Sequence, residues 1–271
     1  MNKTIATKYI AALILAMLLF SACSNMSYQT DFEKIHGTGN LVEETRAVSS
    51  VTGADLNTIG ELTIKLGDTE SLVIEAQSNL MDYIETEMLG ETVRIRNSDG
   101  INLVPTKPIK YILTVKSLDT IKISATGGIT APDLQSEYFS IAMDGPGYLN
   151  MGELNADTVE VNVDSSGDLT IGELNADTLE VNIDSSGNVD ISGGEVKTQN
   201  ITINSGGRYI APDLVSGEAE VLINSSGSVT IWVRETLTAV LTSTGDLNYR
   251  GNPTVDANTN LSLGNVNQIS E

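Results

Sequence analysis

Apolar and polar residues alternate along most of the chain, and from about residue 108 onward the alternation recurs every 20 residues. Each repeat ends in a short turn of small residues closed by glycine. These glycines are Gly127, Gly147, Gly167, Gly187, Gly207 and Gly227, followed by Gly245 after 18 residues. A fixed period of this length is typical of a solenoid, in which each repeat forms one coil and buries its apolar face against its neighbours.

Two neighbouring repeats, 151–167 and 171–187, differ at three positions, and each difference exchanges one apolar residue for another. The apolar residues at the 20-residue spacing form four columns: Ile129, Leu149, Leu169, Val189, Tyr209 and Val229; Met151, Ile171, Ile191, Ala211 and Ile231; Ile141, Val161, Val181, Ile201 and Val221; Met143, Val163, Ile183, Ile203 and Ile223. Columns two residues apart in a repeat lie on one side of a β-strand. The sequence therefore predicts an all-β fold, a right-handed parallel β-helix (β-solenoid) with coils of about 20 residues.

The regular coils are expected over 108–250, within a β-helix domain of residues 48–271. Shorter alternating segments at 48–107 indicate irregular strands that cap the first coil, and 251–271 is expected to cap the other end. The preceding stretch, 23–47, is polar and shows no regular period, so we expect a flexible tether there.

Residues 1–22 have the pattern of a signal peptide, because Lys3 and Lys8 precede an apolar run of 11 residues at 10–20. This run is shorter than the roughly 20 apolar residues that a membrane-spanning helix needs.

The end of the signal, Ser21, Ala22 and Cys23, resembles a bacterial lipobox. Cys23 is the only cysteine, so it cannot form a disulfide within the chain, and we expect it to carry the lipid that anchors the protein to a membrane. Ser24 rather than Asp follows it, which favours the outer membrane of the cell envelope. The alternative is an ordinary secretory signal with Cys23 near its cleavage point.

The charge of the chain narrows the classes of partner and chemistry. Fifteen Lys and Arg stand against 36 Asp and Glu, a net charge of −21, so phosphate backbones are repelled and nucleic acid is excluded as a partner. His36 is the only histidine and falls in the expected tether. A His-based catalytic triad and a zinc site built on His and Cys are therefore not expected in the folded part.

Three features resemble one bacterial family: the segment 60–66, the segment 118–127 and the recurring Asx-Ser-Ser-Gly turns. They are similar to the putative auto-transporter adhesin head domain, or GIN domain, over roughly residues 48–250. The resemblance implies an exported β-helix with a role in surface adhesion. It implies no catalytic or binding residue, and fold by itself does not establish function.

Stacking the repeats places like charges on one another, because Asp157 lies above Asp177 and Asp164 above Asp184 in the alignment. Calcium prefers carboxylate oxygens and relieves such repulsion, so these four residues are the candidate metal ligands. The alternative is a solvated acidic face screened by salt, which needs no cofactor.

Tyr148, Arg208 and Trp232 fall at outward-facing positions and are the candidate binding residues. The alternative for Trp232 is packing over the end of a sheet.

The sequence thus predicts a non-catalytic cell-envelope lipoprotein that acts as an adhesin or surface interaction module for a glycan or protein ligand. Two alternatives stay open. A β-helical polysaccharide-active enzyme would gather carboxylates and a base on one face. A structural assembly lipoprotein would self-associate through its ends, near Leu261 and Leu263.

Overall fold

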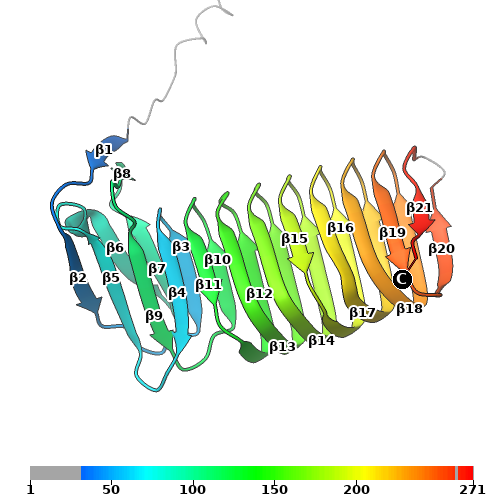
Figure 1. Ribbon diagram of the computed structural model, residues 1–271, viewed down its shortest axis with the longest axis horizontal. Helices are drawn as coiled ribbons and strands as arrows, with labels where there is room; N and C mark the ends of the chain where they lie inside the picture. Colours follow the sequence, from blue (N-terminus) through cyan, green and yellow to red (C-terminus); the bar gives the residue numbers. More distant parts are fainter. Residues whose placement is uncertain (1–31, 260–261, 271) are drawn as a thin grey trace, which may run out of the picture. The chain divides into compact units, whose positions relative to one another are not determined.

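Parallel strands stack coil upon coil in the computed structural model, which describes residues 32–259 and 262–270 (Figure 1). The predicted parallel β-helix is confirmed as a β-solenoid of about seven turns, formed within the unit Lys34–Glu271. The strands are β1 (Glu33–His36), β2 (Leu41–Arg46), β3 (Gly53–Asn57), β4 (Glu61–Leu66), β5 (Ser71–Gln77), β6 (Ile84–Leu89), β7 (Thr92–Asn97), β8 (Ile101–Val104), β9 (Lys110–Val115), β10 (Thr120–Ile123), β11 (Gly128–Ala131), β12 (Leu134–Met143), β13 (Tyr148–Val163), β14 (Asp168–Ile183), β15 (Asn188–Ile191), β16 (Gly194–Ile203), β17 (Arg208–Ile223), β18 (Ser228–Leu241), β19 (Asp246–Arg250), β20 (Thr254–Asn258) and β21 (Val266–Gln268). A single 3₁₀ turn, Met81–Tyr83, is the only helical element in the described residues.

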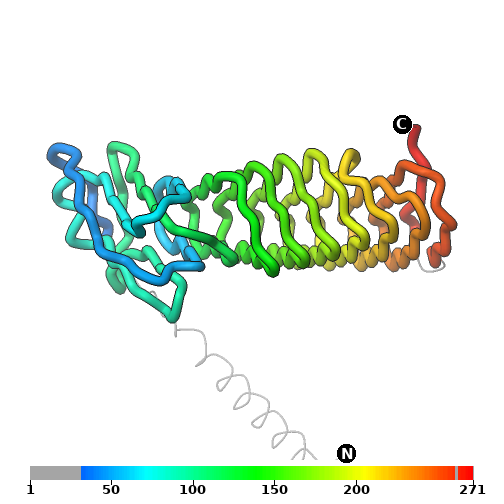
Figure 2. Tube along the Cα trace, turned by 90° about the horizontal axis from the view of Figure 1, so that it is seen from below, coloured from blue at the N-terminus to red at the C-terminus, as the bar shows by residue number. Residues whose placement is uncertain are grey.

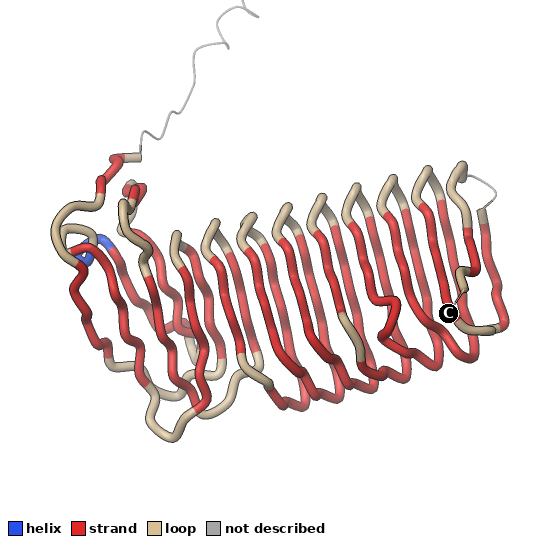
Figure 3. Tube along the Cα trace, viewed as in Figure 1, coloured by secondary structure: helices blue, strands red, loops and turns tan. Residues whose placement is uncertain are grey.

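One coil shows how the alternating pattern becomes a closed turn of the solenoid. Strand β14 runs along one face with Leu169 and Ile171 buried, bends around an edge at Leu174, and returns along the other face with Val181 and Ile183 buried. The Ser-Ser-Gly turn then leads to the next coil. Figure 3 shows these turns as loops along one edge of the stack, while strand continues around most of the opposite edge. The turn edge carries the turns, such as residues 185–187, and the groove edge carries the bends, such as residues 175–177.

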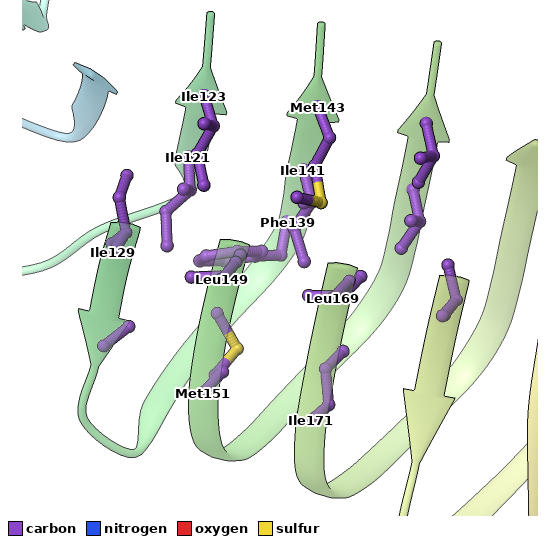
Figure 4. Close-up of a cluster of buried hydrophobic side chains, with 14 of the residues drawn as sticks. Ile121, Ile123, Ile129, Phe139, Ile141, Met143, Leu149, Met151, Leu169 and Ile171 are labelled. Atoms are coloured by element: carbon purple, nitrogen blue, oxygen red, sulfur yellow. The ribbon is translucent and has the colours of Figure 1, made fainter. Parts of the chain in front are cut away.

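The ladder register follows the 20-residue period. Leu149 pairs with Leu169 and Leu169 with Val189, while Val161 pairs with Val181 on the other face. The four predicted columns are buried, and Figure 4 shows side chains of the two faces filling the space between them. Each aliphatic side chain removed from water in this way contributes about 1.5–3 kcal/mol to the stability of the fold. Each coil therefore adds a similar share to the stability of the core.

The turn glycines are required because successive coils approach closely at the turn edge. A Cβ atom added to Gly207 would lie 2.4 Å from Cγ2 of Ile183 and 2.7 Å from the carbonyl oxygen of Gly187. Real Cβ atoms do not approach other atoms this closely, so a larger residue would force the two coils apart.

The coil that contains β18 is two residues shorter than the 20-residue coils before it, and the structure accommodates the difference at its bend. The register of β17 and β18 shifts between Ala211 and Val215 and again between Ser216 and Glu218. Buried polar groups hold this region together. The Tyr209 hydroxyl donates to Oε1 of Gln199 (3.1 Å), Nε2 of Gln199 donates to Oγ of Ser216 (2.7 Å), and that hydroxyl donates to the carbonyl of Trp232 (3.0 Å).

The N-terminal part, residues 48–107, departs from the regular coil. Parallel pairings of β3 with β10 and of β4 with β11 join it to the first regular coils. Antiparallel pairings of β5 with β9 and of β6 with β7 give it a different local topology. In Figure 2 this part, coloured blue to cyan, lacks the even spacing of the coils that follow.

The expectation of a tether at 23–47 is wrong for its described C-terminal half. Strand β2 pairs with β5 along its whole length, from Leu41 opposite Gln77 to Arg46 opposite Leu72, and His36 lies in β1, which pairs with β8. The sequence carries no alternation here because five of the six residues of β2 are exposed and the strand is held through its backbone.

The expected signal peptide, Cys23 and Leu261 lie outside the described residues. Leu263 is described, and 86% of it is exposed. Within the described part of the chain, no helix is long and apolar enough to cross a membrane.

Candidate functional site

An open groove of about 810 Å³ runs along the groove edge, across the bends of six successive coils. Strands β12, β13, β14, β16, β17 and β18 each contribute to it. Its lining consists of Gln135, Ser136, Asn155, Ala156, Asp157, Asn175, Ala176, Asp177, Glu195, Val196, Lys197, Thr198, Gly217, Glu218, Arg234 and Glu235. Six coils stacked at the usual strand spacing of about 4.8 Å give the groove a length of about 24 Å.

Small residues line the groove where neighbouring columns carry longer side chains. Ala156 pairs with Ala176, and Ala176 pairs with Val196 in the next coil. Gly217 also lines it two coils further along the chain from Ala176. The backbones of Ala156 and Ala176 are held in the ladders, and their short side chains leave space in the groove.

Amide side chains form a ladder along one side of the groove. Nδ2 of Asn175 donates to Oδ1 of Asn155 (3.1 Å), and Nδ2 of Asn155 donates to Oε1 of Glu153 (2.8 Å). The backbone N–H of Glu195 donates to Oδ1 of Asn175 (3.2 Å). These bonds hold the amides in fixed orientations, which lowers the entropy that a ligand must offset when it binds them.

The groove lining carries charges of both signs, with more carboxylates than basic side chains. Two ion pairs join neighbouring coils, Nζ of Lys197 to Oδ1 of Asp177 and Nη1 of Arg234 to Oε1 of Glu195, both at 2.6 Å. All four side chains are more than half exposed. Three further carboxylates in the lining form no ion pair with any described residue: Asp157, Glu218 and Glu235. The groove therefore presents uncompensated negative charge.

The four acidic residues predicted as metal ligands lie at two opposite edges. Asp157 and Asp177 line the groove, whereas Asp164 and Asp184 stand at the turn edge, where Oδ1 of Asp184 accepts a hydrogen bond from Nδ2 of Asn204 (2.6 Å). In residues 32–259 and 262–270, no three His, Cys, Asp or Glu side chains gather closely enough to hold a metal ion. Calcium binding stays a prediction from the sequence.

Tyr148 has a structural partner. Its hydroxyl donates to the carboxylate of Glu61 in β4. This hydrogen bond raises the pKa of Tyr148 to about 12, because ionisation of the phenol would break the bond and place two negative charges together.

The three predicted binding residues do not form one site. Tyr148 and Arg208 belong to the same column, but Asp168 and Asn188 lie between them. Trp232 pairs with Val215, in the column that contains Asn155 and Asn175, yet it does not line the groove. Whether any of the three contacts a ligand stays a prediction.

Sequence reasoning missed the groove as a site, although its signal is present in the printed sequence. Residues at the turn edge repeat from coil to coil, whereas the position of Asp157 and Asp177 is occupied by Lys197 and then by Gly217 in the following coils. A position that escapes the repeat is not needed to close the coil, and this one belongs to the groove lining.

Comparison with known structures shows the same fold in other proteins. The chain is similar to a putative lipid binding protein from Parabacteroides distasonis, with 23% identity, a TM-score of 0.80, and 88% of this chain and 100% of the other covered. It is also similar to putative adhesins from Parabacteroides distasonis and Parabacteroides merdae, with 19% and 18% identity and TM-scores of 0.77 and 0.74. In each of these two comparisons 88% of this chain is covered, and 100% and 99% of the other.

No protein of curated function matches the chain. The family model of the putative auto-transporter adhesin, head GIN domain, matches residues 52–253, which include the capping strands, the regular coils and the whole groove. The chain therefore belongs to the putative auto-transporter adhesin, head GIN domain family.

Proposed function

We propose that the protein is a non-catalytic adhesin or surface interaction module of the cell envelope, and that it binds its glycan or protein ligand in the groove. Membership of an adhesin family supports the role, and the open groove carries the assignment of the site. The interior of the solenoid is filled with buried apolar side chains, so the ligand is expected to bind outside. A rigid groove on an elongated stack suits this role, because its side chains need little reordering on binding.

The proposal includes an anchor. Cys23 follows a short apolar run and a lipobox-like sequence, which supports a lipoprotein attached to the outer membrane through its N-terminus. Mass spectrometry of the purified protein should detect a diacylglycerol-modified cysteine, and Cys23→Ala should move the protein from the membrane fraction to the soluble fraction. Recovery of Cys23→Ala in the membrane fraction at the wild-type level would contradict the anchor.

The groove also bears on the enzyme alternative, because it brings carboxylates together with Lys197 and Arg234. Both cations are engaged in ion pairs, and Lys197 is 74% exposed beside Asp177 at 56%. Catalytic groups act most strongly in sites that exclude water and hold them against the reacting atoms. These hydrated pairs suit recognition better than turnover.

The test is binding of the full chain, in a mild detergent, to an array of surface glycans and matrix proteins, in calcium and then in a chelator. Saturable binding to one ligand class supports adhesion, and its loss in the chelator supports calcium at the acidic columns. A blank array in both conditions contradicts adhesion and favours the structural assembly alternative. Release of shortened saccharides from the array would favour the enzyme.

A further inference from the structure

We propose that the groove binds an extended cationic peptide, a lysine- or arginine-rich segment of a partner protein. This inference rests on the proposed function and names the class of its ligand. It is carried by the length of the groove, its charge balance and the absence of aromatic side chains from its lining.

The shape of the groove suits an extended chain. Its length of about 24 Å matches about seven residues of extended polypeptide at 3.3–3.6 Å each. The small side chains of Ala156, Ala176 and Gly217 let a main chain approach the solenoid closely. The amides of Asn155 and Asn175 are held beside them and have the donors and acceptors that a peptide backbone requires.

The charge of the groove selects a cationic ligand. Five carboxylates line it against two basic side chains, and each base is already paired with one carboxylate. Asp157, Glu218 and Glu235 are exposed and lie in three different coils, so they distribute negative charge along the groove. Lysine and arginine side chains of a bound peptide would neutralise them, and the net charge of −21 attracts such a ligand from a distance.

A neutral or acidic glycan fits the groove less well. No Phe, Tyr or Trp belongs to the lining, so the groove offers no flat apolar surface for a sugar ring. An acidic polysaccharide would meet the unpaired carboxylates and be repelled. The observations therefore favour the peptide over the glycan as the ligand.

The experiment measures the affinity of the full chain for a fluorescent peptide of about nine residues in which Lys alternates with Ser. A peptide with Glu in place of each Lys is the ligand control. The groove variant combines Asp157→Asn, Glu218→Gln and Glu235→Gln. The control variant combines Asp256→Asn, Glu180→Gln and Glu220→Gln, which removes the same charge from exposed residues outside the groove.

The groove variant is expected to bind the lysine peptide about tenfold more weakly than the wild type, because it loses three exposed ion pairs that are each of modest strength. The control variant should retain affinity within about twofold, and the glutamate peptide should not bind. Raising the salt concentration should weaken wild-type binding, since the charges are exposed. Melting temperatures of both variants should equal that of the wild type, which shows that both are folded.

Equal loss of affinity in the two variants would overturn the inference, because the peptide would then respond to net charge alone. Binding of an array glycan that the groove variant abolishes, with no binding of the lysine peptide, would also overturn it while supporting the proposed function. A groove variant that retains every interaction of the wild type would contradict both.

Discussion

The two long edges of the solenoid are built from the same repeat, yet they differ in how strictly they follow it. At the turn edge, coil after coil carries a glycine against the preceding turn, and hydrogen bonds join Asn188 to Asp168 and Asn204 to Asp184. At the groove edge, the charge and size of the side chain change between neighbouring coils, as from Asp177 to Lys197. The turn edge serves the close stacking of the coils, whereas we propose that the groove edge serves recognition.

A repeat and its exceptions therefore carry separate information. A residue that recurs in every coil satisfies a requirement that every coil shares, namely close stacking and a paired backbone. A residue that breaks the repeat is free of that requirement, so a surface where such residues gather is a candidate binding site. Four predictions test this division, beginning with the largest effect.

Disrupting the close stacking of the coils at the turn edge should cause the largest loss of stability. Gly207→Ala places a methyl group 2.4 Å from Cγ2 of Ile183 and is expected to lower the free energy of unfolding by about 3 kcal/mol. Gly206→Ala in the same turn is the matched control, because the nearest atom would lie 3.8 Å away. Denaturant unfolding measures both, and equal stability of the two variants would contradict close stacking as the role of the glycine.

The second largest loss of stability is expected from the buried polar groups beside the shortened coil. Tyr209→Phe leaves Oε1 of Gln199 without its donor and is expected to cost about 2 kcal/mol, since an unsatisfied buried acceptor loses its water and gains no partner. Tyr249→Phe changes a partly buried tyrosine and should cost less. Thermal unfolding compares the two, and a smaller loss for Tyr209→Phe would show that this hydrogen bond does not support the bend.

At the groove edge, removal of an ion pair should leave stability nearly unchanged. Lys197→Ala breaks the pair with Asp177, but both side chains are more than half exposed, so the free energy of unfolding should change by less than about 0.5 kcal/mol. A loss comparable to that of Gly207→Ala would mean that the groove edge is structural and would remove the distinction between the edges.

The smallest effect concerns Tyr148 and appears only in alkali. Its pKa is raised to about 12, above the ordinary value of 10.0, so the folded state holds the proton more tightly than the unfolded state. The resulting stability is present below pH 10 and is lost as the pH rises toward 12. Tyr148→Phe should therefore lose less stability than the wild type between these pH values. An identical pH profile for both proteins would contradict the bond to Glu61.

The stacked columns could be predicted because a buried side chain such as Val181 must match the ones above and below it, which leaves a period in the sequence. Strand β2 could not be predicted from the sequence, because backbone hydrogen bonds to β5 hold Leu41–Arg46 and most of the side chains in this strand are exposed. The groove depends on which of its lining residues are small, as Ala156 and Ala176 are. It also depends on the geometry of the bends, which leaves no alternation in the sequence. The partner of Tyr148 lies 87 residues away, beyond any local pattern.

The most direct test of the account compares the groove variant, the charge-matched control variant and Gly206→Ala on the same array of surface glycans and proteins, with melting temperatures measured in parallel. We expect that only the groove variant loses ligand binding and that all three variants melt at nearly the same temperature as the wild type. Full binding by the groove variant, or loss of binding through the control variant or Gly206→Ala at an unchanged melting temperature, would contradict the assignment of recognition to the groove edge.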